Sequence, residues 1–96
     1  MRVYIAGKIT GDKDFKEKFE LHKQQLTTIG YDVLSPADLP NGLTRAEYMR
    51  LCFAMIEMSD IVILLDDYIN SPGALLELEF CKYIGKHYIG RDNAWK

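Results

Sequence analysis

Short β-rich runs recur along the chain and predict four strands. The first is Arg2–Ala6, which Gly7 ends, and the second is Tyr31–Leu34. The third, Ile61–Leu65, is apolar at every position, which is typical of a strand buried on both faces. His87–Ile89 is the last candidate strand before the end of the sequence.

Three amphipathic or apolar stretches between these runs predict helices. Residues Asp12–Ile29 carry apolar side chains at helical spacing, with charged residues on the other face. The second helix, Thr44–Met58, opens on a capping box formed by Thr44 and Glu47. Pro72 suits the first turn of a third helix, which we expect to end near Gly85. The segments 36–43 and 66–71 are expected to be loops.

The predicted order β-α-β-α-β-α-β indicates a three-layer α/β fold of the flavodoxin or Rossmann-like kind. Right-handed crossovers favour a four-stranded parallel sheet of order 2-1-3-4 with helices on both faces. Ligands bind such sheets outside the carboxyl ends of the strands, where the strand order reverses. That crevice lies between strands one and three, so the segments Gly7–Gly11 and Ser71–Glu77 border the expected site.

Composition further limits the domain organisation, partners and location of the protein. The 96 residues predict one domain, 1–96, and a net charge of −2 with no basic stripe argues against nucleic acid as a partner. Cys52 and Cys81 lie in apolar helical patterns, so we expect buried thiols and neither a metal site nor a cofactor. No signal or membrane-spanning pattern is present, which predicts a cytoplasmic protein without membrane contact. The tail Arg91–Lys96 is expected to fray.

The second helix, Thr44–Met58, has almost no polar face. One sheet cannot cover a helix that is apolar all round, so we expect its other side to meet a second subunit. A homodimer or higher homo-oligomer is therefore predicted. The alternative is a helix held between the sheet and a folded-back tail.

The loop after strand one supplies Gly7, Lys8, Ile9, Thr10 and Gly11. Its glycines allow backbone N–H groups to approach an anion, while a lysine adds charge and a threonine adds a hydroxyl. The glycine spacing matches neither the dinucleotide fingerprint nor a P-loop. The alternative is an ordinary strand-to-helix turn with a surface lysine.

The segment that opens the third helix is more informative. Ser71 is a natural N-cap, which places its hydroxyl and the N–H groups of Gly73 and Ala74 at the crevice. Glu77 lies one turn further and leans toward the N-terminus of the helix, over the gap that Gly73 leaves. The alternative is a glutamate on a solvated face. Asp66 comes from the same side and can hold a sugar hydroxyl or solvate its loop.

Other titratable residues are assigned structural roles. We expect His22 to be a packed or half-exposed helix histidine, Glu79 to be solvated beside Lys82, and Asp60 to open strand three far from the crevice. Tyr4 can line the crevice floor or fill the core.

Three segments of the sequence together resemble the nucleoside 2-deoxyribosyltransferase-like superfamily, in particular a compact branch found in bacteria and phages. They are Val3–Gly11, Ser59-Asp60 before an apolar strand, and the spacing Ser71-x-Gly73-x-x-x-Glu77. The serine six residues before the glutamate is similar to the deoxynucleoside 5′-monophosphate N-glycosidases.

The resemblance implies a retaining glycosyl transfer. Glu77 would be the nucleophile at the sugar C1′, and Tyr4 would orient it or the sugar. Ser71, the Gly7–Gly11 loop and the start of the third helix would hold a 5′-phosphate. The chain departs from the family pattern in two places: residues 51–54 hold no acid to assist the leaving base, and Glu79 replaces a common glycine.

Three functions follow from these observations. The first is an enzyme that cleaves or exchanges the N-glycosidic bond of a (deoxy)nucleoside or its 5′-monophosphate. The second is a nucleotide-binding module without catalysis. The third is a dimeric interaction protein that uses the second helix and no ligand.

Overall fold

The computed structural model describes residues 1–91, so the expected fraying of 92–96 lies outside the described part. Within that part, no helix has the length and apolar character that crossing a membrane requires. The elements are β1 (Arg2–Ala6), α1 (Phe15–Thr28), β2 (Asp32–Leu34), α2 (Arg45–Met58), β3 (Ile61–Leu64), α3 (Pro72–Ile84) and β4 (Tyr88–Gly90).

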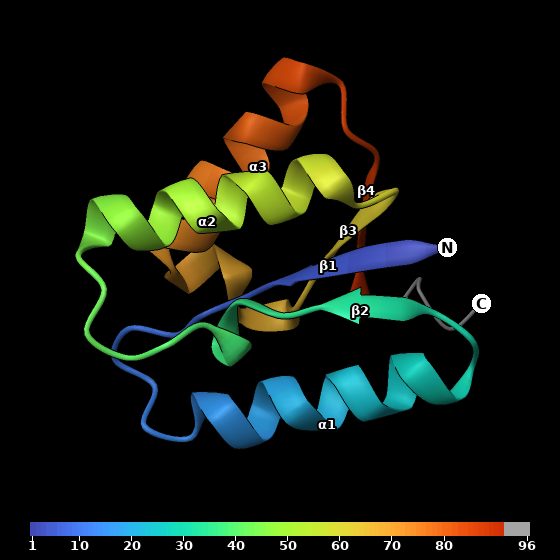
Figure 1. The fold of residues 1–96 in the computed structure, drawn as a ribbon, viewed down its shortest axis with the longest axis horizontal. Coiled ribbons are helices and arrows are strands. Elements are labelled where there is room, and N and C mark those ends of the chain that lie inside the picture. Colours follow the sequence, from blue (N-terminus) through green and yellow to red (C-terminus); the bar gives the residue numbers. More distant parts are fainter. Residues whose placement is uncertain (92–96) are drawn as a thin grey trace.

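The four strands form one sheet in the order β2-β1-β3-β4, and every neighbouring pair is parallel. In the register of the central pair, Val3 lies beside Ile61 and Ala6 beside Leu64. Figure 1 shows α1 on one face of the sheet and α2 with α3 on the other. The predicted fold class, strand order and placement of helices on both faces are confirmed.

Alternating residues of β1 divide the core between the two faces. Val3 and Ile5 pack in the cluster that includes Phe19 and Leu26 of α1. Tyr4 and Ala6 point to the opposite side, into the cluster that includes residues of α2 and α3. Tyr4 therefore faces the helix that carries Glu77, and it is fully buried there.

Some element boundaries differ from the prediction for local reasons. Helix α1 begins at Phe15 and not at Asp12, because the Asp12 carboxylate caps a turn by accepting hydrogen bonds from the Asp14 amide (2.9 Å) and from Lys18 Nζ (2.7 Å). The two expected loops contain short 3₁₀ helices, Pro36–Asp38 and Asp66–Asn70.

Helix α2 matches its predicted range and has both hydrogen bonds of the capping box between Thr44 and Glu47. Its apolar surface is covered in part by α3, since Phe53 stacks on Phe80 with ring centroids 4.1 Å apart. The assumption that only the sheet covers α2 was therefore wrong. Leu51 and Met58 on the same helix remain 40% and 56% exposed.

Arg91 is buried, so the prediction that fraying begins at this residue is wrong. Its Nε donates a hydrogen bond to His22 Nδ1 (2.8 Å), and its Nη2 donates to Gln25 Oε1 (2.7 Å). These contacts attach the residue after β4 to α1. His22 is accordingly a half-buried helix histidine, as expected, with a structural partner.

This contact makes stability depend on pH. Burial and the positive charge of Arg91 lower the pKa of His22 from its usual 6.5. A histidine whose pKa is lowered by folding stabilises the protein fully above the unfolded pKa, and that stability is lost as the pH falls below it. Between about pH 8 and pH 5, we expect the free energy of unfolding of the wild type to fall more steeply than that of His22→Asn, measured by urea denaturation.

The exposed His87 provides the matched control. His87→Asn should retain the full pH dependence of the wild type, whereas His22→Asn should flatten the part that His22 causes. Equal pH dependence in the wild type and in His22→Asn would contradict the role of this contact.

Candidate active site

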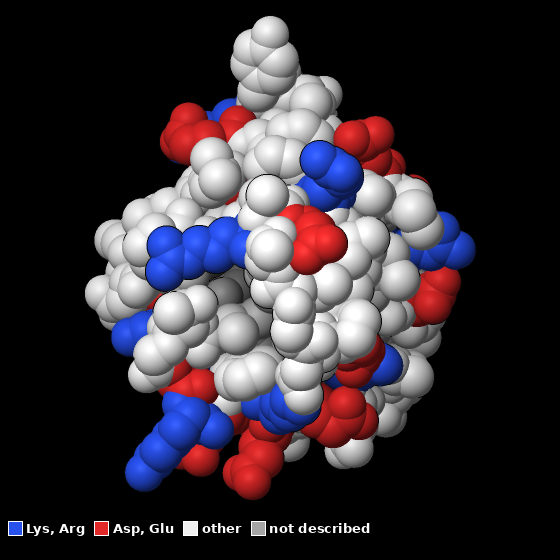
Figure 2. All heavy atoms as spheres, turned by 60° about the vertical axis from the view of Figure 1, so that its left-hand side comes forward, with Lys and Arg blue, Asp and Glu red and all other residues white. Residues whose placement is uncertain are grey.

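A cavity of about 500 Å³ lies at the carboxyl edge of the two central strands. It is enclosed by the loop after β1, the first turns of α2 and the start of α3, as the switch-point rule predicts. Figure 2 shows a hollow on this side of the molecule, bordered mostly by uncharged side chains with basic side chains near its rim. The lining residues are Gly7, Ile9, Thr10, Arg45, Ala46, Tyr48, Met49, Ser71, Pro72, Gly73, Ala74, Leu76 and Glu77.

Among residues 1–91, Glu77 supplies the only carboxylate that lines this cavity, and it is just 4% exposed. Its Oε2 accepts a hydrogen bond from Tyr4 Oη at 2.5 Å. The two residues are 73 positions apart in sequence, and the contact joins the central strand β1 to the inner face of α3. Glu77 is therefore held at the cavity by a rigid element on each side.

The environment of this pair changes its acid–base behaviour. Burial raises the pKa of Glu77 from 4.5 to about 7, although the hydrogen bond from Tyr4 partly offsets the rise. Burial, together with the nearby negative charge of Glu77, raises the pKa of Tyr4 well above 10.0. Tyr4 thus remains protonated and donates its hydrogen, while Glu77 can exchange a proton near neutral pH.

The start of α3 is arranged as the sequence indicates, with one difference. Ser71 is the N-cap, and its Oγ accepts a hydrogen bond from the Ala74 amide at 3.1 Å. That amide is consequently occupied and does not face a ligand freely. Gly73 lines the cavity, where an added Cβ would meet only Met49 and Ser71 at ordinary contact distances of 3.6 and 3.9 Å.

The loop after β1 packs tightly against the end of β3. A Cβ at Gly7 would lie 2.9 Å from Leu65 Cδ1 and 3.1 Å from Asp67 Oδ1, so a side chain here would force these neighbours to shift. Asp67 Oδ1 also accepts a hydrogen bond from the Lys8 amide at 3.0 Å. Lys18 then ties both segments together through ion pairs with Asp12 and Asp67.

These contacts separate the predicted binding residues into two groups. Gly7, Ile9, Thr10, Ser71, Gly73 and Ala74 line the cavity with Glu77, and Tyr4 lies directly behind it. Lys8, Gly11 and Asp66 do not line it. The reason is that Asp67 binds the backbone of the loop at Lys8, while Asp66 is exposed at the start of its 3₁₀ helix.

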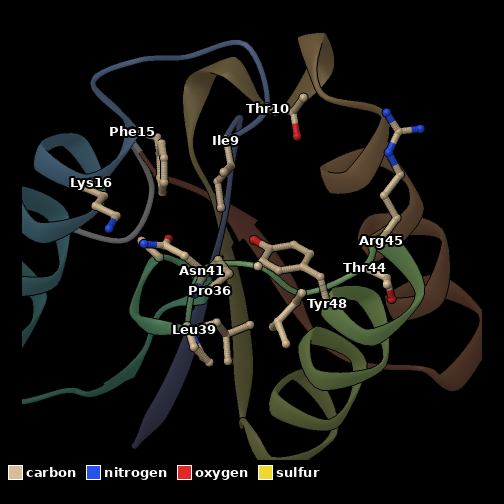
Figure 3. A pocket seen from close by; sticks show the side chains of 14 residues that line it. Ile9, Thr10, Phe15, Lys16, Pro36, Leu39, Asn41, Thr44, Arg45 and Tyr48 are labelled. Atoms are coloured by element: carbon tan, nitrogen blue, oxygen red, sulfur yellow. The ribbon is translucent and has the colours of Figure 1, made fainter.

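A second cavity of about 240 Å³ adjoins the first and shares four of its lining residues, Ile9, Thr10, Arg45 and Tyr48. Figure 3 shows the Tyr48 ring extending from α2 toward Ile9, with its hydroxyl inside the pocket. Phe15, Pro36 and Leu39 add further apolar walls, and Asn41 adds an amide. Sequence reasoning missed this pocket.

One feature of the sequence could have pointed to the missed residues Arg45 and Tyr48. The capping box starts α2 at Arg45, so Arg45 and Tyr48 belong to the turn that meets the carboxyl edge of the sheet. Arg45 lines both cavities and provides a positive charge there. Helix periodicity alone assigned Tyr48 to an apolar face and did not relate it to Glu77.

Asp60 and Glu79 have the structural contacts expected of them. Asp60 Oδ2 accepts a hydrogen bond from the Arg2 amide (2.8 Å), and Glu79 pairs weakly with Lys82 (3.5 Å) on the surface. Among residues 1–91, His, Cys, Asp and Glu side chains form no group of three that could hold a metal ion.

Residues 1–89 match the family described as Domain of unknown function (DUF4406), and the chain therefore belongs to that family. No curated protein matches the chain in sequence.

Two similar solved structures are 2-deoxyribosyltransferases. One is from the psychrotolerant bacterium Bacillus psychrosaccharolyticus, with a TM-score of 0.72 and 20% identity over 94% of this chain and 71% of that protein. The other is from Leishmania mexicana, with a TM-score of 0.71 and 21% identity over 93% of this chain and 62% of that protein. The fold is thus that of the nucleoside 2-deoxyribosyltransferases, and the resemblance seen in the sequence is confirmed at this level.

Burial of Glu77 predicts a measurable cost in stability. Because folding raises the pKa of this carboxyl, stability falls as the pH rises from about 4.5 to about 7. At about 1.4 kcal/mol per pKa unit, the cost at pH 8 is about 3 kcal/mol. We expect Glu77→Gln, which can still accept the hydrogen bond from Tyr4, to be more stable than the wild type by roughly this amount at pH 8.

Urea denaturation at several pH values measures the difference, which should shrink toward pH 5. Glu79→Gln on the exposed face of the same helix is the matched control and should leave stability within about 0.5 kcal/mol of the wild type. A Glu77→Gln variant that is less stable than the wild type at pH 8 would contradict a buried charge at this position.

Proposed function

We propose that this member of the DUF4406 family cleaves or transfers the N-glycosidic bond of a (deoxy)nucleoside or its 5′-monophosphate, with Glu77 as the nucleophile. The observation that carries the proposal is the buried Glu77 carboxylate, bound by Tyr4 and open to a cavity of about 500 Å³. A carboxylate positioned in this way suits covalent catalysis at a sugar carbon.

The two connected cavities match the parts of such a substrate. The sugar would lie over Glu77, and its 5′ end would meet Ser71 and Gly73 at the start of α3, with Arg45 as counter-charge to a phosphate. A planar base would enter the second cavity between Ile9 and Tyr48. Apolar walls with a few polar groups are typical of small-molecule sites.

The reaction would proceed in two steps. A Glu77 carboxylate oxygen attacks C1′ as the C1′–N bond breaks, and the bonding electron pair leaves with the base. Water or a second base then attacks C1′ of the glycosyl-enzyme ester and releases the carboxylate. The hydrogen bond from Tyr4 to Oε2 orients Glu77 and leaves Oε1 for the attack.

Two further observations support this function. The similar solved structures are 2-deoxyribosyltransferases, and they share the fold of this chain. Near neutral pH, a Glu77 pKa of about 7 leaves a substantial fraction of the carboxyl ionised and able to attack.

We expect the wild type to release free base from at least one member of a panel of nucleosides and 5′-monophosphates, measured by chromatography. The rate should rise with pH through about 7 as Glu77 ionises. Glu77→Gln should lower it on the order of 10³-fold or more while the protein stays folded, because the nucleophile is lost. Glu79→Gln should keep the wild-type rate.

The outcomes separate the three candidate functions. Equal base release by the wild type and Glu77→Gln would exclude Glu77 as nucleophile. Nucleotide binding by calorimetry without turnover would favour a binding module, which the lack of a second carboxylate among the described residues that line the cavities would explain. A stable oligomer that neither binds nor turns over nucleotides would favour an interaction protein.

We also infer that the chain forms a homodimer or higher homo-oligomer through α2. Leu51 and Met58 stay exposed on this helix, and Leu76 and Tyr83 of α3 are 50% and 91% exposed. Large contiguous patches of exposed apolar side chains commonly mark interaction sites. Cys52 and Cys81 are free, buried thiols, which agrees with a cytoplasmic location.

Light scattering coupled to gel filtration tests the oligomer. We expect the wild type to have at least twice the monomer mass and Leu51→Asp to shift it toward the monomer. Leu21→Asp is the control, since Leu21 is 54% exposed on α1, on the other side of the sheet. A monomeric wild type, or equal dissociation by both variants, would refute an interface on α2.

A further inference from the structure

Breaking the bond from a sugar to a nitrogen base requires a group that stabilises the departing base. Glycoside hydrolysis generally uses two carboxyl groups, one as nucleophile and one as acid. In the described part of the chain, Glu77 is the only carboxyl group that lines either cavity. Glu47 of α2 is exposed and accepts a hydrogen bond from the Thr44 amide in the capping box, so it is not available to act as the acid. Another type of side chain must take the second role.

Tyr48 is positioned for this role by the local structure of α2. It is half-buried and lines both cavities, so it lies where the proposed sugar and base positions meet. The capping box fixes the start of the helix, and the Tyr48 amide donates to the Thr44 carbonyl at 2.9 Å. Figure 3 shows the hydroxyl inside the pocket, near Ile9.

The surroundings of Tyr48 keep its hydroxyl protonated. Burial, followed by the charges of Cys52 and Glu77, raises the pKa of Tyr48 well above 10.0. The Cys52 thiol is fully buried and interacts with the hydroxyls of both Tyr4 and Tyr48, and burial together with the charge of Glu77 raises its pKa to about 11. The neutral Tyr48 hydroxyl is therefore a hydrogen-bond donor at every physiological pH.

The other donors shared by the two cavities are less suited. Thr10 is exposed on the loop after β1. Arg45 is also exposed and stays charged, so it suits an anion that persists throughout the reaction. Tyr48 is half-buried, and the charge of Glu77 contributes to its raised pKa.

We propose that Tyr48 is a catalytic residue whose Oη–H donates a hydrogen bond to the departing base. This proposal rests on the proposed function. As Glu77 bonds to C1′, the electron pair of the C1′–N bond moves onto the base, and the hydroxyl stabilises the resulting negative charge. In hydrolysis, the water that attacks C1′ in the second step leaves its hydroxyl on the sugar, and its proton neutralises the base. Neither Tyr48 nor Glu77 is consumed.

The test compares Tyr48→Phe with the wild type on two leaving groups. One substrate is the 2′-deoxynucleotide that the wild type cleaves, and the other is its activated analogue. An N7-methylated purine departs as a neutral base, and a 5-fluorinated uracil departs as a more stable anion, so both need less assistance. Removing the hydroxyl should slow kcat/KM for the ordinary base by roughly 10²-fold and for the activated base much less.

Tyr83→Phe is the matched control, because Tyr83 is 91% exposed on α3 and lines neither cavity. Thermal denaturation checks that Tyr48→Phe remains folded. Cys52→Ala keeps the Tyr48 hydroxyl and removes only the thiol that interacts with it. Cys52→Ala should retain most of the leaving-group preference of the wild type.

The possible results distinguish the role of Tyr48 from the proposed function on which it rests. Equal losses on both leaving groups, or no loss, would overturn the role of Tyr48 and leave Glu77 as nucleophile intact. No base release by the wild type from any substrate would overturn the proposed function and the Tyr48 role with it. A loss confined to the ordinary base would establish the role.

Discussion

The site is organised around the hydrogen bond between Tyr4 of β1 and Glu77 of α3. A carboxylate buried in a low-polarity interior is costly unless it is hydrogen-bonded, and here one strong donor meets it at 2.5 Å. The donor comes from the central strand of the sheet, where alternation directs Tyr4 toward α2 and α3. The geometry of Glu77 thus depends on the register of β1 as much as on α3.

The parallel sheet explains why the cavity forms around this pair. The loops after β1 and β3 emerge side by side, and they are packed so closely that a side chain at Gly7 would force its neighbours to shift. Lys18 and Asp67 then hold the loop of residues 7–14 against the segment that leads into α3. This network uses the Lys8 amide and the Asp67 carboxylate for structure. Neither residue lines the cavity, which Ser71, Gly73 and the first turns of α2 border.

Several features could be predicted because they depend on local pattern. The continuous apolar run of β3 indicated a strand buried on both faces, the capping box marked the start of α2, and Ser71 followed by Pro72 marked the start of α3. The position of Glu77 one turn below Gly73 follows from helix geometry alone. The burial of Arg91 and the covering of α2 by α3 were misjudged, because the partner residues His22 and Phe80 lie on helices distant in sequence.

The sequence by itself determined the α/β fold, the strand order and the edge of the sheet where a site forms, since hydrophobic period and chain handedness constrain these directly. It also pointed to Glu77 at that edge, and the structure shows this carboxylate lining the cavity. Only the tertiary structure decided that Tyr4 binds Glu77, that burial brings the pKa of Glu77 near 7, and that Arg45 and Tyr48 enter the cavities. These features arise from contacts between residues far apart in the chain, and no local pattern encodes the distances or the burial on which they depend.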